Sequence, residues 1–250
     1  MTIRGIIFDL GWTLMDFDGD MMATLAERAR DVGGFLQTNG FDLEGMAVFD
    51  SYRQEMRTLW EAGRELNYEY PARLAMLRAL RRHLSHADAA RLARGATMAS
   101  FESLIPCWEL YADTLSTLTI LSDAGYRLGC ISNTNHSPLV WGMIERGGLR
   151  SWLSPIYASE EIGLRKPHPR LFHSVLEDWG LSPAEVVMVG DTLNADVLGA
   201  RNAGMRGVWI DRGPVSPWSN NEASKAHIQP DATLQQLAEL PELIKDWQGG

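Results

Sequence analysis

The stretch IRGIIFDLGWTL, residues 3–14, decides the fold of this chain. Residues 3–10 are rich in β-branched and aromatic side chains, and the run ends in an acid, Asp9, with Gly11 close behind it. A short apolar run of this kind, polar only at its end, is typical of a strand buried on both faces of a parallel sheet. We therefore expect residues 3–10 to form such a strand.

Beyond residue 105 the sequence alternates between helix-like and strand-like segments. Strands that alternate with helices predict a parallel sheet covered by helices on both faces. The first strand belongs to this sheet. The expected strands are 126–132, 156–158, 186–190 and 206–210, and the expected helices are 111–124, 138–147, 169–179, 195–203 and 234–244.

Residues 21–103 carry helical periodicity and almost no strand-like stretch. We therefore expect a helical segment to be inserted after the first strand of the sheet. The predicted fold class is α/β, with a parallel-sheet core formed by residues 1–17 and 106–250 and an inserted all-helical unit at residues 18–105. The segment 214–226, which contains Pro, Ser and Asn, is expected to be a surface loop.

Composition limits the class of protein. With 45% hydrophobic and 22% charged residues in 250, the chain has the material for a sizeable core. The net charge of −9 argues against nucleic acid as the main partner. No apolar run reaches the length of about 18 residues that a membrane span needs. The two cysteines, Cys107 and Cys130, cannot form a disulfide framework, and a cytoplasmic location is expected.

Polar residues gather where the predicted strands end, and in a parallel α/β sheet ligands bind beyond those ends. Carboxylates crowded together repel one another unless a cation lies between them, and oxygen ligands suit Mg²⁺. One carboxylate could then attack a phosphorus atom, with a lysine and a hydroxyl neutralising the transferring group. The residues in question are Asp9, Thr13, Ser132, Asn133, Lys166, Asp191 and Asp196.

Four segments carry a resemblance to a known family. FDLGWTL (8–14), ISNTN (131–135), GLRKPHP (163–169) and VGDTLNAD (189–196) resemble, in order and spacing, the four motifs of the haloacid dehalogenase-like hydrolases. The helical insertion resembles the cap that one branch of this superfamily carries between motifs one and two. The resemblance implies a Rossmann-like core and covers essentially the whole chain.

The resemblance also implies roles for individual residues. Asp9 corresponds to the catalytic nucleophile, and Lys166 to the lysine that stabilises the nucleophile and the phosphoryl group. Ser132 corresponds to the phosphate-binding hydroxyl, which backbone N–H groups around Asn133 would assist. Thr13 corresponds to a substrate-side residue whose hydrogen bond positions the loop of motif one.

The same resemblance implies a Mg²⁺ site. Its ligands would be Asp9, the backbone carbonyl of Gly11, and the acids Asp191 and Asp196. Asp196 could also cap the helix that follows it.

Residue 11 departs from the pattern of the family's phosphatases, which usually carry a second aspartate there. That carboxylate protonates the leaving group and then activates water, and losing a general acid–base of this kind typically costs about 10²–10⁴-fold in rate. Gly11 keeps the backbone carbonyl that the metal site needs. Asp16 and Asp18 are candidate surrogate acids.

The function that we predict from the sequence is Mg²⁺-dependent hydrolysis of small phosphate esters, such as sugar phosphates, through an aspartyl-phosphate. The partner would be a small phosphorylated metabolite. Two alternatives stay open: a metal-independent 2-haloacid dehalogenase, and a catalytically weakened binding or regulatory protein of the same fold. The phosphonate-hydrolysing branch uses a cap lysine, and none of the three lysines lies in the insertion. His136 is expected to be a solvated loop residue.

Overall fold

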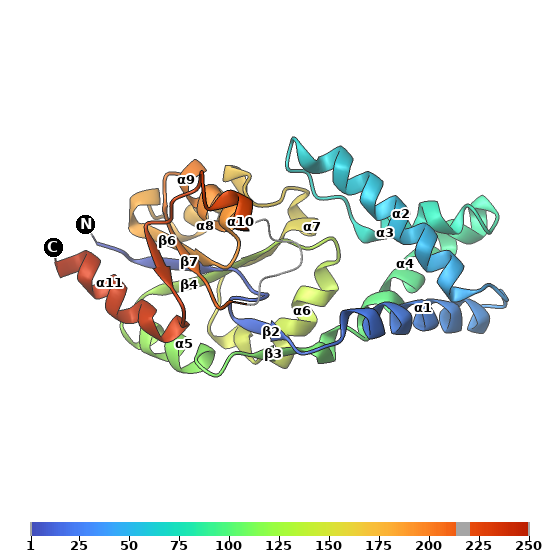
Figure 1. Ribbon diagram of the computed structural model, residues 1–250, viewed down its shortest axis with the longest axis horizontal. Helices are drawn as coiled ribbons and strands as arrows, with labels where there is room; N and C mark the ends of the chain where they lie inside the picture. The colour runs from blue at the N-terminus through green and yellow to red at the C-terminus, as the bar shows by residue number, and fades with distance from the viewer. Residues whose placement is uncertain (1, 214–220, 250) are drawn as a thin grey trace.

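A computed structural model of the chain describes residues 2–213 and 221–249 (Figure 1). Its centre is a six-stranded parallel sheet with the strand order β5-β4-β1-β6-β7-β8. The strands are β1 (Gly5–Phe8), β4 (Arg127–Ser132), β5 (Ile156–Ala158), β6 (Val186–Gly190), β7 (Arg206–Ile210) and β8 (Ala232–Leu234). The α/β class expected from the sequence is confirmed.

Helices cover both faces of the sheet. Strand residues that alternate in direction supply one apolar cluster to each face, as a buried parallel sheet requires. One face packs against α5 (Thr114–Asp123), α6 (Ser137–Arg146) and α11 (Leu240–Gly249), and the other against α8 (Pro169–Trp179) and α9 (Leu198–Asn202).

The register of the central strands fixes where the functional residues meet. Phe8, the last residue of β1, pairs with Cys130 of β4 on one side and with Val189 of β6 on the other. Because all three strands are parallel, the residues that follow them emerge at one edge of the sheet. This is the edge at which ligands bind in open α/β sheets.

The insertion forms a helical unit with an apolar core of its own. Its four helices pack against one another around buried side chains such as Leu36, Phe49, Met76 and Leu92. They are α1 (Met21–Thr38), α2 (Gly45–Arg64), α3 (Ala72–Leu80) and α4 (His86–Glu102), and they lie to the right of the sheet in Figure 1. We call this unit the helical insert.

The chain crosses between sheet and insert twice, and the two crossings pair with each other. β2 (Met15–Phe17) leads out of the sheet, and β3 (Trp108–Leu110) leads back, forming an antiparallel two-stranded ribbon. Phe17 pairs with Trp108 in this ribbon. This ribbon was not predicted from the sequence, because each strand is only three residues long.

Two local predictions near the C-terminus were wrong. The helix expected over 234–244 begins later, because Leu234 instead pairs with Ile210 at the edge of the sheet and α11 starts beside Pro241. Within the expected surface loop 214–226, residues 214–220 lie outside the described residues. Asn221, however, begins a short helix, α10 (Asn221–Ser224), and is buried.

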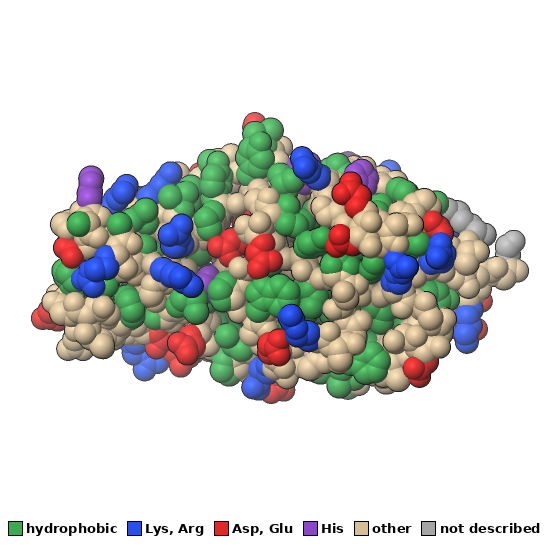
Figure 2. Space-filling view, turned by 180° about the vertical axis from the view of Figure 1, so that it is seen from behind, with side chains coloured by type: hydrophobic (Ala, Val, Ile, Leu, Met, Phe, Trp, Pro, Cys, Tyr) green, Lys and Arg blue, Asp and Glu red, His purple; other side chains and the backbone are tan. Residues whose placement is uncertain are grey.

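Among the described residues, no helix is both long and apolar enough to cross a membrane. On the face shown in Figure 2, basic and acidic side chains are interspersed between apolar ones.

Candidate active site

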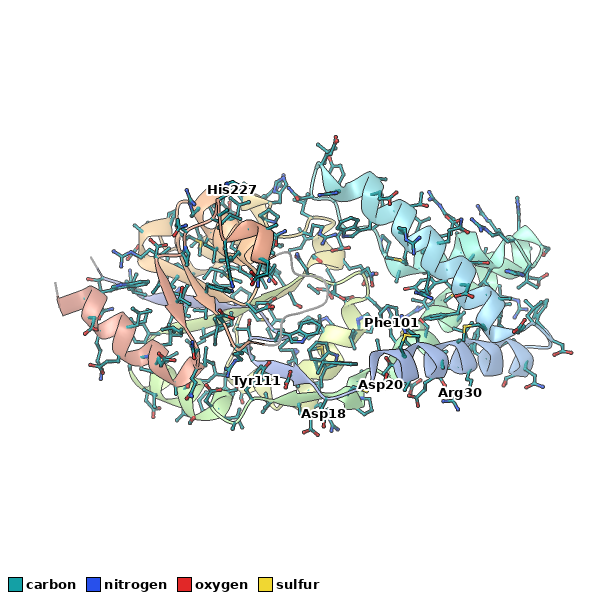
Figure 3. The ribbon with its side chains drawn as sticks, in the orientation of Figure 1. Asp18, Asp20, Arg30, Phe101, Tyr111 and His227 are labelled. Carbon is teal, nitrogen blue, oxygen red and sulfur yellow. The ribbon has the colours of Figure 1, made fainter. Side chains whose placement is uncertain are left out.

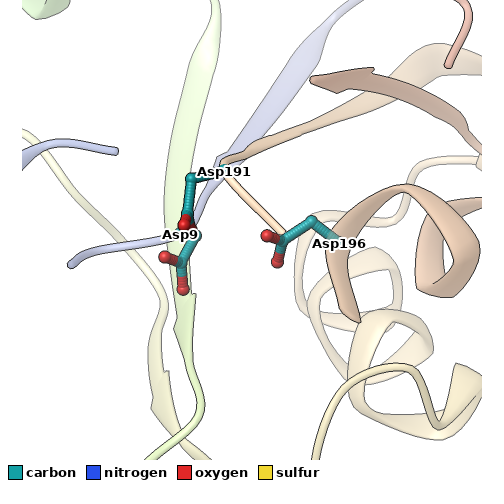
Figure 4. A group of neighbouring side chains, drawn as sticks. All are labelled: Asp9, Asp191 and Asp196. Carbon is teal, nitrogen blue, oxygen red and sulfur yellow. The ribbon is translucent and has the colours of Figure 1, made fainter. Parts of the chain in front are cut away.

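Three aspartates meet at the carboxyl edge of the sheet. Asp9 follows β1, Asp191 follows β6, and Asp196 lies in the π-helical turn Leu193–Val197 just beyond it. One carboxylate oxygen from each lies within 4.8 Å of the others, and all three residues are buried (Figure 4). Residues far apart in the sequence thus form one acidic cluster, as their motif positions predicted.

Lys166 enters the same cluster from the loop before α8. Its Nζ lies 2.5 Å from Asp9 Oδ1 and 2.7 Å from Asp196 Oδ1, and it donates to the Ile131 carbonyl at 2.9 Å. The side-chain amide of Asn133 forms two hydrogen bonds with the backbone of Lys166. Lys166 N–H donates to Asn133 Oδ1 at 2.8 Å, and Asn133 Nδ2 donates to the Lys166 carbonyl at 3.1 Å. The side chain of Asn133 therefore positions Lys166.

The electrostatics of the cluster show an excess of negative charge. Burial raises the pKa of Asp9 to about 6, with Lys166 lowering it and Asp196 raising it further. Burial, and then the charges of Asp9 and Asp196, raise the pKa of Asp191 well above its usual range. Burial alone would lower the pKa of Lys166, but its ion pairs with Asp196 and Asp9 raise it. One ammonium group does not balance three carboxylates.

The donor set fits a divalent cation. Asp191 Oδ2 is buried and has no hydrogen-bond partner among the described residues, a costly state for a carboxylate oxygen. Three carboxylates within 4.8 Å of one another offer the hard oxygen ligands that Mg²⁺ prefers. A divalent cation held by Asp9, Asp191 and Asp196 would give Asp191 Oδ2 a partner and would balance the negative charge.

The loop that carries Asp191 is fixed by two residues that the sequence analysis missed. Asn221 Nδ2 donates to the Asp191 carbonyl at 2.7 Å, while Asn221 Oδ1 accepts from Leu193 N–H at 2.9 Å. Trp209 Nε1 donates to the same Asp191 carbonyl at 2.9 Å. Asn221 lies in a polar stretch, where nothing in the local pattern distinguishes a buried support from a solvated turn.

Asp196 needs a glycine beside it. A Cβ atom at Gly190 would lie 2.2 Å from Asp196 Cγ, so any side chain there would displace the carboxylate. Asp196 Oδ2 accepts a hydrogen bond from Thr192 N–H at 2.9 Å. The prediction that Asp196 caps the following helix was wrong: the N-cap of α9 is Val197, and the Asp196 carboxylate bonds to a residue that precedes it.

Ser132 ends β4 at the same edge of the sheet and is 8% exposed. Its hydroxyl makes no hydrogen bond within the described part of the chain, which leaves it free for a ligand. Thr13 is fully buried, and its Oγ1 has no partner among the described residues, so the hydrogen bond expected of it is not made. The turn of motif one is held instead by backbone bonds from Leu14 and Met15 to the Leu10 carbonyl.

Gly11 faces the Trp108 indole. A Cβ atom at residue 11 would lie 2.9 Å from Trp108 Cη2 and 3.1 Å from Cζ3. Trp108 is 7% exposed and is held by edge-to-face contacts with Trp12 and Phe17, at ring-centroid distances of 4.8 and 5.3 Å. The Trp108 side chain of β3 therefore occupies the space beside Gly11, the position at which the family's phosphatases usually carry an aspartate.

The two candidate surrogate acids are both exposed. Asp16 is exposed on β2 and accepts a hydrogen bond from the Tyr111 hydroxyl at 3.1 Å. Asp18 lies at the outer edge of the molecule (Figure 3). The expectation for His136 was also wrong: it is 6% exposed and stacks on Phe101 of the insert, with ring centroids 4.3 Å apart.

The insert reaches the segment that precedes Lys166. Tyr68, in the connection between α2 and α3, forms an antiparallel bridge with Leu164. The Ser159 hydroxyl donates to Glu69 Oε2 at 3.0 Å, and burial raises the pKa of Glu69. The loop that presents Lys166 is therefore in contact with both parts of the molecule.

The chain is similar to known hydrolases. A family description of haloacid dehalogenase-like hydrolases matches residues 3–204. The chain is 27% identical over 246 residues to the glyceraldehyde 3-phosphate phosphatase of Methanopyrus kandleri, covering 98% of each chain. It is 50% identical over 95 residues to the phosphoserine phosphatase of Thermus thermophilus, covering 37% of this chain and 34% of that protein.

Among solved structures, the 2-haloacid dehalogenase of Pseudomonas syringae pv. Tomato DC3000 has the same fold. The TM-score is 0.73 at 21% identity, over 98% of this chain and 100% of that one. The family match runs from the first strand through the acidic cluster and ends just after α9. The chain belongs to the haloacid dehalogenase-like hydrolases and is an enzyme of that family.

Proposed function

We propose that this enzyme hydrolyses small phosphate esters with Mg²⁺, through an aspartyl-phosphate on Asp9. The observation that carries the proposal is the acidic cluster, in which three buried carboxylates share one lysine and Asp191 Oδ2 has no partner among the described residues. The names of the glyceraldehyde 3-phosphate phosphatase and the phosphoserine phosphatase support phosphate esters as the substrate class.

The metal would be held by Asp9, Asp191, Asp196 and the backbone carbonyl of Gly11. When bound, Mg²⁺ would supply positive charge that orients the phosphate and shields it from the carboxylates. Without that charge, a dianionic phosphate would be repelled by the acidic cluster.

Asp9 attacks the phosphorus atom. A bond forms between its carboxylate oxygen and phosphorus while the ester P–O bond breaks, and the leaving oxygen takes its proton from solvent. Lys166 stays protonated beside Asp9 and, with the Ser132 hydroxyl, neutralises the phosphoryl oxygens. Water then attacks phosphorus and passes its proton to solvent while the bond between phosphorus and the Asp9 oxygen breaks, which releases phosphate and restores the Asp9 carboxylate.

The leaving group receives no proton from residue 11. Trp108 packs against Gly11, and Asp16 and Asp18 are exposed and form no hydrogen bond to the cluster among the described residues. Esters whose alcohol is itself a good leaving group should therefore react fastest, because they depend least on a general acid. The helical insert would act as a cap that excludes water and selects the leaving group.

The test is phosphate release from p-nitrophenyl phosphate and from a panel of sugar and hydroxy-acid phosphates, with Mg²⁺ and with chelator. We expect turnover only with Mg²⁺, and a loss of at least about 10³-fold in Asp9→Asn. Asp18→Asn is the matched control and should stay near wild type. Metal-independent halide release from 2-chloropropionate, or phosphate release by Asp9→Asn at the wild-type rate, would contradict the proposal.

A further inference from the structure

Arg28 lies inside the helical insert, two turns from the start of α1. Its guanidinium carbon is 5.0 Å from the ring centroid of Phe49 and 4.6 Å from that of Phe101. Its Nε donates to the Ser100 carbonyl at 2.5 Å, and its charge interacts with the hydroxyl of the buried Tyr52. The partly buried cation thus lies against aromatic rings and neutral oxygens.

No carboxylate balances this charge within the described residues. Four exposed arginines of the insert form ion pairs: Arg53 with Asp50, Arg78 and Arg82 with Glu55, and Arg91 with Asp88. Arg28 forms none, and burial lowers its pKa. A partly buried charge without a counter-ion is stabilised when an anion binds beside it.

The surroundings of Arg28 face the core. Phe101, whose ring packs on Arg28, also stacks on His136 at the start of α6, and Figure 3 places Phe101 at the core-facing end of the insert. One turn after Tyr52 on α2, Met56 Sδ accepts a contact from Asn135 Nδ2 at 3.9 Å. The positive charge of Arg28 also acts on His136. Burial lowers the pKa of His136 to about 4, and the charge of Arg28 is the second cause of this decrease.

His136 belongs to the loop that starts at the active site. This loop begins at Ser132, beside Lys166, and four residues later reaches His136. Four residues of extended chain span at most about 14 Å. His136, whose ring stacks on the Phe101 side chain that packs on Arg28, therefore lies within that distance of Ser132.

We propose that Arg28, with the Tyr52 hydroxyl, binds a carboxylate on the leaving-group side of the substrate, so that the enzyme prefers phosphate esters of small hydroxy acids. This proposal rests on the phosphatase function proposed above. A planar guanidinium pairs with a carboxylate through two parallel hydrogen bonds. The single charge of a carboxylate matches one arginine, whereas a second phosphate would leave unbalanced negative charge between aromatic walls.

Tyr52 can serve as a donor in this site. It is 3% exposed, and burial raises the pKa of its hydroxyl, so the proton stays in place throughout the working pH range. The hydroxyl oxygen can accept from Arg28 while its proton points to the ligand.

The experiment compares 2-phosphoglycolate with 2-hydroxyethyl phosphate, which replaces the carboxylate by a hydroxymethyl group. We expect the wild type to favour 2-phosphoglycolate in kcat/KM, mainly through KM. Arg28→Met should lower this ratio about 30- to 1,000-fold, the range for truncating one partner of an enclosed charged pair. Arg28→Lys should keep part of the preference. Arg30→Met, an exposed position on the same helix (Figure 3), should leave both substrates unchanged.

Binding of phosphonoacetate and of methylphosphonate, measured by calorimetry, gives the same comparison without turnover. The wild type should bind phosphonoacetate more tightly, and Arg28→Met should abolish the difference. A wild type without preference for the carboxylate, or an equal loss on both ligands in Arg28→Met and Arg28→Lys, would overturn the proposal and leave Arg28 as a link between α1 and α4. Hydrolysis of p-nitrophenyl phosphate by the wild type reports separately on the proposed function.

Discussion

The acidic cluster at the sheet edge and the Arg28 site in the helical insert carry opposite charge imbalances. At the sheet edge, three carboxylates share the single ammonium group of Lys166. In the insert, Arg28 is surrounded by Phe49, Phe101 and neutral oxygens, with no ion pair among the described residues. Some surface charges are paired instead, such as Arg4 with Glu185 and Arg91 with Asp88. An imbalance in an enclosed place indicates a ligand of the opposite sign.

The two sites also differ in how the chain builds them. Parallel strands bring the acidic cluster together, because their carboxyl ends must meet at one edge of the sheet. The Arg28 site depends on the packing of α1, α2 and α4 and on the contact of Phe101 with His136. The first arrangement follows from sheet topology, whereas the second depends on how helices pack.

Of the three changes that test this comparison, the largest effect is expected from removing Lys166, the one cation that the described residues place in the acidic cluster. Lys166→Met leaves three buried carboxylates facing one another, so kcat/KM should fall about 10²–10³-fold and the free energy of unfolding by about 3–5 kcal/mol. Because protonation relieves the repulsion, the loss of stability should be smaller at pH 5 than at pH 8. Lys245→Met is the control, since that lysine is exposed and pairs only with Glu242. A variant as stable as wild type at pH 8 would contradict the charge imbalance.

A smaller effect is expected at residue 11, where Trp108 of β3 packs against the loop that follows β1. Gly11→Asp places a Cβ atom 2.9 Å from Trp108 Cη2 and should lower the free energy of unfolding by about 1–3 kcal/mol. In a Trp108→Ala background the same substitution should cost less, because the indole is gone. Chemical denaturation of the two single variants and the double variant measures this coupling. Equal costs of Gly11→Asp in both backgrounds would show that Trp108 does not restrict residue 11.

The smallest effect concerns the pH dependence at His136. Its pKa is lowered to about 4 from an ordinary value of 6.5, so the folded state binds fewer protons than the unfolded state between these values. Stability is therefore present above pH 6.5 and is lost as the pH falls toward 4, by about 1–2 kcal/mol between pH 6.5 and 5. His136→Phe keeps the stack on Phe101 and should remove this part of the dependence, whereas His86→Gln, at an exposed position, should not. A His136 imidazole that titrates near 6.5 by NMR would contradict the burial argument.

The strongly patterned parts of the chain were predictable. The apolar run before Asp9, the VVMVG strand before Asp191 and the alternation after residue 105 indicated a parallel sheet with acids at its edge. Parallel strands leave few alternatives for where such acids lie. Lys166 was predictable because its motif stands between two of these strands and lysines are rare in the chain.

Supporting residues escaped prediction because their surroundings are made by distant segments. Asn221 lies in a polar stretch, yet it holds the Asp191 carbonyl. His136 is polar and follows a motif, yet Phe101 covers it. Trp108 stands 97 positions from Gly11, and only the pairing of β2 with β3 brings them together. No local pattern encodes these contacts.

The sequence by itself determined the α/β class, the helical detour after the first strand and the set of acids and lysine that meet beyond the strands. Periodicity and strand-end position are local properties, and parallel pairing turns them into one site. Only the tertiary structure decided that Trp108 takes the space beside Gly11 and that Arg28, one of many arginines in the insert, has no acidic partner among the described residues. Both depend on side chains that come within a few ångströms of each other only when separate elements pack.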